Sequence, residues 1–434
     1  MCSVSLLADL QSRGLCQQTS DPQLDAKLEV LKRSGPVAAY AGFDPTADSL
    51  HIGHYMGIRG LMTAQRNGLR PIAICGGATG MVGDPSGRTT ERELLTRQTV
   101  AEYLVGIRRV LEKFLDFGHP TVPAMIVNNM DWFGAMSAID FLRDVGKSFR
   151  IGTMLAKDSV RSRMEGSEEG MSYTEFSYQV LQAYDFYRLY KDHRCLVQLG
   201  GSDQWGNITA GIDLIRKLEG EGGSAFGITW PLITDSTGRK FGKSEGNAVW
   251  LTADRTSVFD FYQFWMRTED ADVERYLRFF TFLPLEQIAA AAAEHRAAPE
   301  KRIAQKLLAR EMTTLVHGQQ ACEQAIAASQ AMYGGGVEEL TAAAVEALAA
   351  QGVPTTTIPR TTIETGWPVV DAAVHAGLAK SKGEARRLIQ QGGLYVNNQP
   401  VSDASAVLRA DSLVAAGALV LRSGKKNYRL VRVV

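Results

Sequence analysis

Short apolar runs alternate with longer segments of helical spacing in the first half of the chain. Turn residues bound each run, and the runs cover 37–43, 71–75, 124–127 and 195–199. The segments with helical apolar spacing cover roughly 52–66, 91–115, 139–145 and 173–190. Strand alternating with helix predicts an α/β fold built on a doubly wound parallel sheet. Because ligands bind beyond the carboxyl ends of such strands, we expect the chemistry in the loops that follow the runs.

The second half of the chain changes character twice. Long Ala-rich helical patterns run from about Phe259 to Tyr333, a Gly triplet at 334–336 interrupts them, and a Pro/Thr-rich segment at 351–366 is typical of an extended linker. The 434 residues are enough for two or three domains. We expect a sheet domain, an α-helical domain, a linker region and a small α+β domain, at 1–255, 256–335, 336–366 and 367–434.

The formal net charge of zero conceals an uneven distribution. Residues 367–434 hold ten basic and four acidic side chains, a net charge of +6, and the remainder of the chain therefore carries −6. A compact basic module behind a linker is typical of a nucleic-acid binder, although a solvated charged face would also fit.

Cysteine usage and hydropathy limit the class of protein further. Five widely scattered Cys residues, with no CxxC pair, make a disulfide framework or a zinc site unexpected. No stretch of about 18 uncharged apolar residues occurs. We expect a cytoplasmic protein without a membrane anchor, and an organellar origin stays open.

Two histidines follow the first run. His51 and His54 are three residues apart at the start of a predicted helix, where they would share a face beside exposed backbone amides. That arrangement suits phosphate oxygens, and Gly53 would let a ligand approach the backbone. A metal pair or ordinary packing are the alternatives.

The segment after the second run is glycine-rich. Its spacing does not meet the dinucleotide pattern GxGxxG, so a dehydrogenase is weakly supported. Asp84 sits in a turn at the end of the strand, where its carboxylate could accept hydrogen bonds from an ammonium group. The alternative is a carboxylate that only forms the turn.

The predicted helix at 173–190 carries polar side chains on one face. Tyr178, Gln182 and Asp185 are spaced i, i+4 and i+7 among apolar neighbours. A polar stripe on an otherwise apolar helix favours the lining of a pocket.

A second glycine-rich segment contains Lys240, Lys243 and Ser244. It resembles a P-loop, but three residues separate its glycines where four are required. A loop with two ammonium groups could instead hold a departing pyrophosphate. Two surface lysines without a function are the alternative.

Together these motifs resemble the HIGH and KMSKS signatures of class I aminoacyl-tRNA synthetases, here HIGH at 51–54 and KFGKS at 240–244. The segments YAGFDPTADSLHIGH, GGATGMVGDPSG, TEFSYQVLQAYDF and LGGSDQWGNITAG are similar to the bacterial tyrosyl-tRNA synthetase family. The terminal segment LAKSKGEARRLIQQGGLYVNN resembles an alpha-L RNA-binding motif of the ribosomal small-subunit type.

The resemblance implies a Rossmann-like fold and a role for each matching residue. The tyrosine substrate would contact Tyr40, Asp84, Tyr178, Gln182, Asp185, Gln198 and Gln204. ATP would contact Gly42, Asp44, His51, Gly53, His54, Asp203 and Lys243. The catalytic set would be His51, His54, Lys240, Lys243, Ser244, Arg88 and Arg92. RNA would contact Lys380, Lys382, Arg386, Arg387, Lys425 and Lys426.

The resemblance also implies the reaction and its participants. The partners would be L-tyrosine, ATP with Mg²⁺, and tRNA(Tyr), and a homodimer would form around residues 122–146. Ala41 stands where many relatives carry a Cys that reaches the ribose, Arg88 stands where Lys is frequent, and Phe241-Gly242 departs from the KMSKS pattern. The departures affect only details of ATP binding.

Three other functions compete with this interpretation. A tryptophanyl-tRNA synthetase would share the fold and the signatures, but would not be expected to carry Asp185 opposite Tyr40 or the basic end module. An RNA-binding or splicing protein on an inactive synthetase scaffold is disfavoured by the intact His and Lys residues. An NAD-dependent oxidoreductase comes last because its fingerprint spacing fails.

Overall fold

The computed structural model describes residues 5–86, 95–165, 170–236, 238, 241, 243–244, 247–333, 342–350, 353–414, 417–424 and 427–434. Contacts divide the chain into two compact units. The first combines Met1–Thr252 with Glu269–Ala293, and the second combines Ala253–Thr268 with Glu294–Val434. Both units are therefore discontinuous in sequence.

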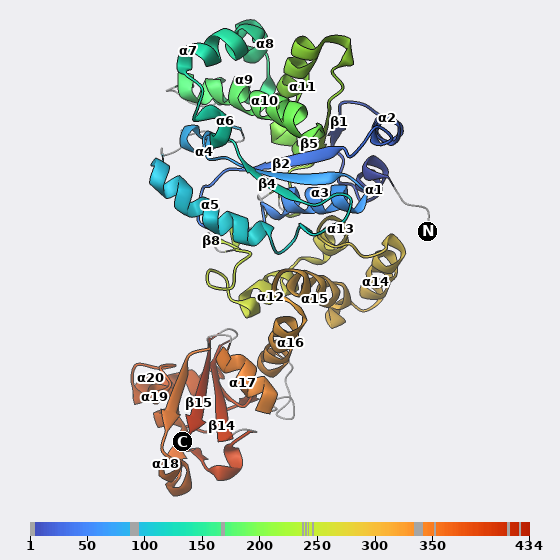
Figure 1. Ribbon diagram of the computed structural model, residues 1–434. Coiled ribbons are helices and arrows are strands. Elements are labelled where there is room, and N and C mark those ends of the chain that lie inside the picture. The colour runs from blue at the N-terminus through green and yellow to red at the C-terminus, as the bar shows by residue number, and fades with distance from the viewer. Residues whose placement is uncertain are drawn as a thin grey trace. The chain divides into compact units, whose positions relative to one another are not determined.

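The first unit is built on a six-stranded sheet with the order β1-β6-β5-β2-β3-β4 (Figure 1). Its strands are β1 (Gln18–Thr19), β2 (Ala38–Phe43), β3 (Arg70–Cys75), β4 (Met125–Asn128), β5 (Cys195–Gly201) and β6 (Phe226–Trp230). The neighbours from β6 to β4 pair in parallel, which confirms the predicted α/β sheet. Strand β1 pairs antiparallel with β6, so the sheet has one antiparallel edge that the sequence analysis did not predict.

Helices cover both faces of this sheet, as a doubly wound fold requires. Figure 1 shows α10 (Tyr173–His193) and α11 (Trp205–Glu219) on one side and α3 (Tyr55–Arg66) on the other. Phe186 of α10 and Ile208 of α11 are fully buried in one cluster with Tyr40 and Ile72 of the central strands. This packing fixes α10, and with it the polar face predicted to line a pocket, against the strands that carry the expected site.

Other helices complete the first unit and the connections of the chain. They are α1 (Leu6–Ser12), α2 (Leu24–Lys32), α4 (Thr79–Val82), α5 (Arg97–Leu111), α6 (Met130–Phe133), α7 (Ala138–Asp140), α8 (Ile151–Leu155), α9 (Asp158–Glu165), α13 (Asp270–Phe280) and α14 (Leu285–Ala297). Helix α5 begins later than predicted because Thr96 caps it, its hydroxyl accepting a hydrogen bond from the Thr99 amide at 3.1 Å. The segment expected as one helix at 139–145 is α7 followed by a π-helical turn at Phe141–Val145.

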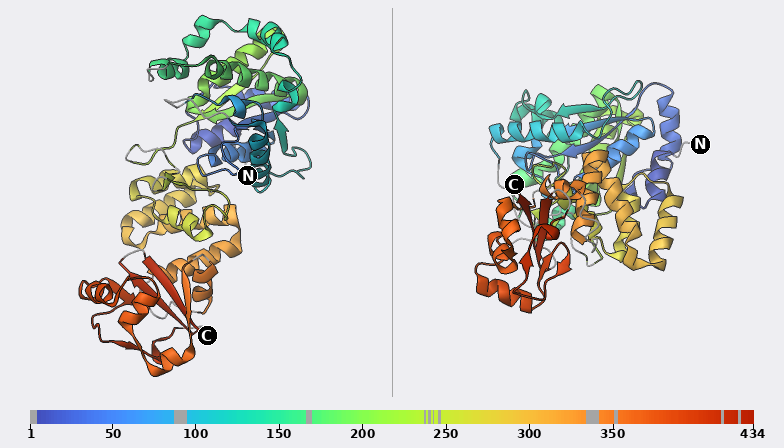
Figure 2. Two further views of the ribbon diagram at one scale, coloured as in Figure 1. Left: turned by 90° about the vertical axis from the view of Figure 1, so that its left-hand side faces the viewer. Right: turned by 90° about the horizontal axis from the view of Figure 1, so that it is seen from below.

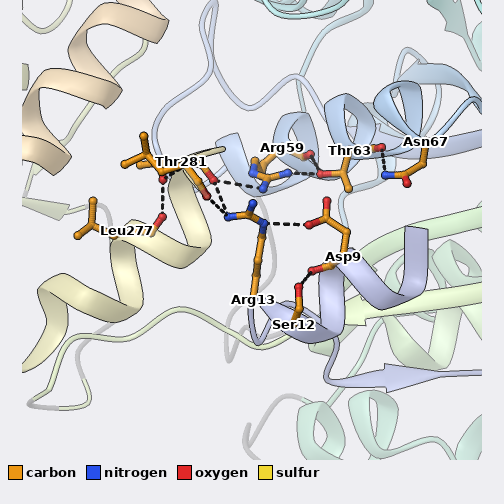
Figure 3. A network of polar contacts seen from close by, with 9 residues as sticks. Asp9, Ser12, Arg13, Arg59, Thr63, Asn67, Leu277 and Thr281 are labelled. Carbon is orange, nitrogen blue, oxygen red and sulfur yellow. Dashed lines mark hydrogen bonds and ion pairs between the residues drawn. The ribbon is translucent and has the colours of Figure 1, made fainter. Parts of the chain in front are cut away.

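A buried network ties the end of α13 to α3 and α1 (Figure 3). The carbonyl of Thr281 accepts hydrogen bonds from Arg59 Nη2 at 3.2 Å and Arg13 Nη1 at 3.5 Å. Arg59 is completely buried, and its guanidinium lies 3.5 Å from the ring centroid of Phe282. Burial lowers the pKa of Arg59 to about 10, so the side chain remains a cation at neutral pH. The carboxyl end of α13 is therefore held by charged donors and not only by apolar packing.

The second unit combines helices with a small sheet. Its helices are α12 (Val258–Met266), α15 (Ile303–His317), α16 (Gln319–Tyr333), α17 (Ala342–Ala350), α18 (Arg360–Thr365), α19 (Val369–His375) and α20 (Lys382–Gln390). Its strands are β9 (Thr355–Ile358), β10 (Trp367–Pro368), β11 (Leu394–Val396), β12 (Gln399–Pro400), β13 (Val407–Leu408), β14 (Ala418–Ser423) and β15 (Asn427–Val433).

The sheet in this unit has the order β12-β11-β14-β15-β9 and is packed on both faces (Figure 2). Leu419 and Leu421 are buried against α19 and α20, whereas Val420 faces the opposite cluster with α17. Strand β9 pairs in parallel with β15. The Pro/Thr-rich segment that looked like a linker therefore contributes both a strand and α18 to this unit. Nowhere in the described residues does a helix reach the length and apolarity that crossing a membrane would need.

Candidate active site

A cavity of about 290 Å³ opens at the carboxyl ends of the central strands. Strands β2 and β5, the loop after β3 and helix α10 supply its walls. Twelve of the residues predicted from sequence line it: Tyr40, Gly42, Asp44, Gly53, His54, Asp84, Tyr178, Gln182, Asp185, Gln198, Asp203 and Gln204. Since these residues come from segments far apart in the chain, the parallel sheet is what brings them together.

The Asp185 carboxylate is a buried acidic group of the cavity, and the residue is 3% exposed. Oδ1 accepts a hydrogen bond from Trp132 Nε1 at 2.9 Å, and Oδ2 accepts one from Asn129 Nδ2 at 3.1 Å. Burial raises the pKa of Asp185 well above its ordinary value, although both donors oppose that change. The carboxylate is therefore oriented by two neutral donors and lacks a compensating cation among the hydrogen bonds it makes.

Tyr40 of β2 lines the cavity beside this carboxylate. Its hydroxyl is buried and has no hydrogen-bond partner within the described part of the chain. Burial, and next the charge of Asp185, raise the pKa of Tyr40 well above its ordinary value. Leaving a buried hydroxyl unsatisfied costs about 1–3 kcal/mol, so the position favours a ligand with a polar group there. A phenol could donate to Asp185 and accept from Tyr40.

A second polar group of residues surrounds the middle of the cavity. Gln204 Nε2 donates to Asp84 Oδ2 at 2.7 Å, and Gln182 Nε2 donates to Gln204 Oε1 at 3.1 Å. The Tyr178 hydroxyl donates to Asp44 Oδ2 at 2.8 Å. Asp84, Tyr178 and Gln182 place acceptor oxygens in this part of the cavity, which suits an ammonium group.

Sequence reasoning missed the side chains that hold these groups in place. Asn129 and Trp132 orient Asp185, and the Thr79 hydroxyl donates to Asp44 Oδ1 at 2.8 Å. Asn207 Nδ2 donates to Gln182 Oε1 at 2.9 Å. Asn129 directly follows β4, so the rule that sites lie after parallel strands could have found it. No sequence signal indicates Thr79 or Asn207.

The two histidines lie close together, but not for the predicted reason. Helix α3 begins at Tyr55, so His51 and His54 occupy the turn before it and do not share a helix face. The turn places their ring centroids 3.9 Å apart, and the His51 amide donates to His54 Nδ1 at 3.2 Å. A Cβ at position 53 would lie 2.8 Å from the His51 ring, so a larger residue there would displace that ring from its present position. The positive end of α3 still faces the same place.

The second signature runs beside the first. Lys243–Ser244 form strand β7, which pairs with β8 (Asn247–Ala248). His51 forms an antiparallel bridge with Trp250, and the Ile52 amide donates to the Val249 carbonyl at 2.8 Å. The first signature therefore bonds to Val249–Trp250, the residues that directly follow β8. Arg88, Arg92 and Lys240 lie outside the described residues, as do the side chains of Lys243 and Ser244.

Four of the cations expected to contact RNA lie on or just before helix α20 and are exposed. Helix α20 buries Ala385 and Ile389 and leaves Lys382, Arg386 and Arg387 in solvent, with Lys380 exposed just before it. Lys382 Nζ pairs with Asp371 Oδ1 at 2.6 Å. Lys425 and Lys426 lie outside the described residues. In the ranges the structure describes, no cluster of three or more His, Cys, Asp or Glu side chains could hold a metal ion.

A doubly wound sheet with Gly53 and His54 of the HIGH segment in the wall of a cavity, and with KFGKS later in the sequence, is typical of a class I aminoacyl-tRNA synthetase. Residues 32–334 match the family model of class I tRNA synthetases for Trp and Tyr, and residues 345–431 match the C-terminal domain of tyrosine–tRNA ligases. The chain is 50% identical to tyrosine–tRNA ligases of Bacillus subtilis and Geobacillus stearothermophilus, over 98% and 99% of its length and 99% and 100% of theirs.

Solved structures agree with these sequence matches. A C-terminally truncated mitochondrial tyrosyl-tRNA synthetase of Aspergillus nidulans is 34% identical, with a TM-score of 0.65 over 74% of this chain and 92% of that one. A tryptophanyl-tRNA synthetase of Encephalitozoon cuniculi shares the fold at 10% identity, with a TM-score of 0.51 over 73% of this chain and 87% of that one. The chain belongs to the tyrosine–tRNA ligase family, and it is an enzyme of that class.

The Asp185→Asn variant should be more stable than the parent without substrate. Since the folded-state pKa of Asp185 is raised, its ionisation destabilises the folded chain increasingly as pH rises above about 4, the ordinary value. We expect the Asn variant to gain about 1–3 kcal/mol in free energy of unfolding at pH 8, and the gain to vanish near pH 4. Urea denaturation at both pH values measures it, and a gain that does not change with pH would contradict the assignment.

Proposed function

We propose that the cavity activates L-tyrosine with ATP and that the tyrosyl group then passes to tRNA(Tyr). A carboxylate oxygen of tyrosine attacks the α-phosphorus of ATP, the bond from that phosphorus to the β-phosphate bridging oxygen breaks, and pyrophosphate leaves. A ribose hydroxyl at the 3′ end of tRNA next attacks the acyl carbon and releases AMP. The observation that carries this proposal is the pairing of Asp185 with the unsatisfied Tyr40 hydroxyl in a cavity beside the two signatures.

Asp185 would supply the specificity for tyrosine. A phenol donates its proton to the carboxylate, whereas phenylalanine would leave the buried charge without its donor. The raised pKa of Asp185 agrees with a group whose charge is compensated only when substrate is present. With discrimination achieved by one missing hydrogen bond, the chain needs no editing domain.

The other cavity residues would hold the ends of the amino acid and the nucleotide. Asp84, Tyr178 and Gln182 would accept hydrogen bonds from the ammonium group, with Gln204 near the carboxylate. Gln198 Oε1 is buried without a partner among the described residues, which suits a supporting contact in the same pocket. Asp203, Asp44 and Gly42 would face the ribose and adenine side.

Positioning and charge would supply the rate enhancement, because a carboxylate needs no general base to attack phosphorus. His51, His54 and the amino end of α3 would donate to the triphosphate, and the second signature would stabilise charge on the departing pyrophosphate. This role would fall to Lys240, Lys243 and Ser244, with Arg88 and Arg92, which stand between α4 and α5 in the sequence. Mg²⁺ would bind to the phosphates of ATP and arrive with the nucleotide, because an ion bound to phosphates and water needs few ligands from the protein.

Tyrosine-dependent exchange between ATP and pyrophosphate tests the first step. We expect exchange with tyrosine and far less with phenylalanine or tryptophan. The His51→Ala and His54→Ala variants should lose about a hundredfold in kcat, with little change in tyrosine affinity, because their donors act on the phosphates. Exchange by the parent that is equal for tyrosine and tryptophan would exclude the proposed specificity. Unchanged exchange in both variants would remove the histidines from the mechanism.

We also propose that residues 367–434, together with β9, bind tRNA in the cytoplasm. The helices expected as one domain at 256–335 are divided between the two units, because α13 belongs to the first unit and α12, α15 and α16 belong to the second. The exposed cations of α20 support the RNA contact, because Arg386 and Arg387 point away from the Ala385–Ile389 core. Backbone phosphates bind such a row of guanidinium groups without reading sequence.

Replacing both arginines by Ala should leave exchange unchanged and weaken tRNA binding. We expect the slope of log K against log salt to fall by about 2, since two phosphate contacts are lost. The Arg386→Lys, Arg387→Lys double variant keeps both charges and serves as the control. Filter binding over a salt series measures the effect, and identical slopes for the Ala variant and the parent would exclude this face as the RNA contact.

Exposed apolar side chains support a homodimer. Ile139 is 70% exposed, Leu142 50% and Ile151 59%, all in the short helices after β4, and residues 122–146 were predicted to form the contact. Exposed apolar side chains in neighbouring segments of the chain favour an interface between copies.

The Ile139→Asp, Leu142→Asp double variant should sediment as a monomer at micromolar concentration, whereas the parent sediments as a dimer. Charge at the centre of an apolar interface costs several kcal/mol of association free energy, about 2–5 kcal/mol. The Val30→Asp variant, exposed on α2, is the control because it lies outside this surface. A parent chain that sediments as a monomer would contradict the proposal outright.

A further inference from the structure

The base of the second signature loop is held by side chains from α13. The Ser236 amide donates to Asp272 Oδ2 at 2.8 Å, and the Thr234 carbonyl accepts from Arg275 Nη2 at 2.6 Å and from the Tyr276 hydroxyl at 3.2 Å. Positions 272, 275 and 276 lie on one helix face because they are three and four residues apart. Side chains from one turn of α13 therefore bind the backbone of Thr234 and Ser236, in the segment between the end of β6 and KFGKS.

Asp272 and Arg275 also bind each other. Arg275 Nη2 lies 2.7 Å from Asp272 Oδ1, so the two carboxylate oxygens serve different partners, one on α13 and one on the loop. The Asp272 carboxylate is almost completely buried. A buried, ionised acceptor shared by a backbone amide and a guanidinium is a strong anchor compared with a neutral loop contact.

Phe241 anchors the far side of this loop on the same helix. Its ring centroid lies 4.8 Å from that of Tyr276 and 4.9 Å from that of Phe280, and its amide donates to the Ile233 carbonyl at 3.0 Å. Phe241 stands inside the KFGKS signature, between the two lysines. The departure from KMSKS therefore places the Phe241 ring against Tyr276 and Phe280 of α13, two rings that we call the aromatic socket.

The socket connects onward to the first signature. The Tyr55 hydroxyl donates to the Phe280 carbonyl at 2.9 Å, and Tyr55 directly follows His54. The Thr281 carbonyl, one residue further, is held by Arg59 and Arg13 (Figure 3). Helix α13 thus contacts Ser236 and Phe241, which lie before and within the second signature. At its carboxyl end it also contacts α3, the helix that follows the first signature.

We infer that Asp272, with Arg275, is a positioning residue for the ATP-dependent step. The carboxylate fixes the backbone at Thr234–Ser236 and thereby sets where the cations of the KFGKS loop meet the phosphates. Asp272 is not among the residues that line the cavity, and it binds the backbone at Ser236, which leads to KFGKS, so we expect it to act on the nucleotide half of the reaction. A loop anchored before substrate binds loses less conformational entropy in the transition state. The inference rests on the proposed role of Lys243 in binding pyrophosphate.

The test uses the full chain in tyrosine-dependent exchange. Asp272→Ala should lower kcat about tenfold and raise KM for ATP, with KM for tyrosine unchanged, because the lost contact is a charge-assisted hydrogen bond. Asp272→Asn keeps an oxygen that can accept from Ser236 and should recover part of kcat. Arg278→Ala is the matched control, since Arg278 is exposed on the same helix and pairs with Glu274. It should behave as the parent.

A second comparison separates positioning from general damage to the fold. In a Lys243→Ala background the loop has lost the cation that it positions, so adding Asp272→Ala should cost much less than it does in the parent. Full additivity of the two losses would overturn the inference, as would an equal rise in KM for tyrosine and for ATP. A parent chain without exchange would refute the proposed function, whereas an active parent with unaffected Asp272 variants refutes only the positioning role.

Discussion

Parallel strands that end at a common edge are the constraint on which the whole site depends. Tyr40, Asp84 and Gln198 are far apart in sequence and reach one cavity only because β2, β3 and β5 terminate together. Backbone polar groups at that edge face a crevice between the crossover connections, so the fold provides a polar opening before any side chain is chosen. The packing of α10 and α11 on one face then determines which side chains point into it.

The buried carboxylate of Asp185 lowers the stability of the folded chain, and in the proposed function the same carboxylate selects tyrosine over phenylalanine. Two neutral donors orient it, yet burial raises the pKa of Asp185, so ionisation of this carboxylate costs free energy in the folded chain. Proteins commonly retain such destabilising groups where a ligand completes them. The nearby Tyr40 hydroxyl, buried with no partner among the described residues, belongs to the same arrangement. Under the proposed function, one phenol would donate to Asp185 and accept from Tyr40, and would satisfy both groups.

The sequence predicted the elements with a clear period and missed those set by tertiary contacts. Runs at 37–43 and 195–199 became β2 and β5 because a buried parallel strand is apolar throughout. Strand β1 has only two residues and follows from its partner β6, so no local signal could reveal it. The turn at His51 was taken for helix because i, i+3 spacing fits both.

The candidate site shows the same division. Residues inside recognisable motifs, such as Tyr178, Asp84 and His54, were found, whereas their supporting side chains were not. Thr79 and Asn207 form hydrogen bonds to groups more than twenty residues away in the sequence. Contacts of this kind produce no repeating pattern of residue types that sequence analysis could detect. The Pro/Thr-rich composition at 351–366 predicted a linker because composition reflects only local conformational preference. It contains no information on the pairing of β9 with β15, which makes this segment part of the sheet.

Each of the two units is built from two separate segments of the chain, and this constrains how such a chain could have evolved. The first unit needs Glu269–Ala293, which carry α13, while the intervening segment with α12 belongs to the second unit. A single recombination breakpoint between residues 252 and 294 would separate α13 from the sheet or α12 from α15 and α16. Exchange of the helical part for that of another enzyme would therefore require two breakpoints, or a graft that rebuilds the contacts of α13. The interleaved chain makes inheritance of the two units as one block the simplest route.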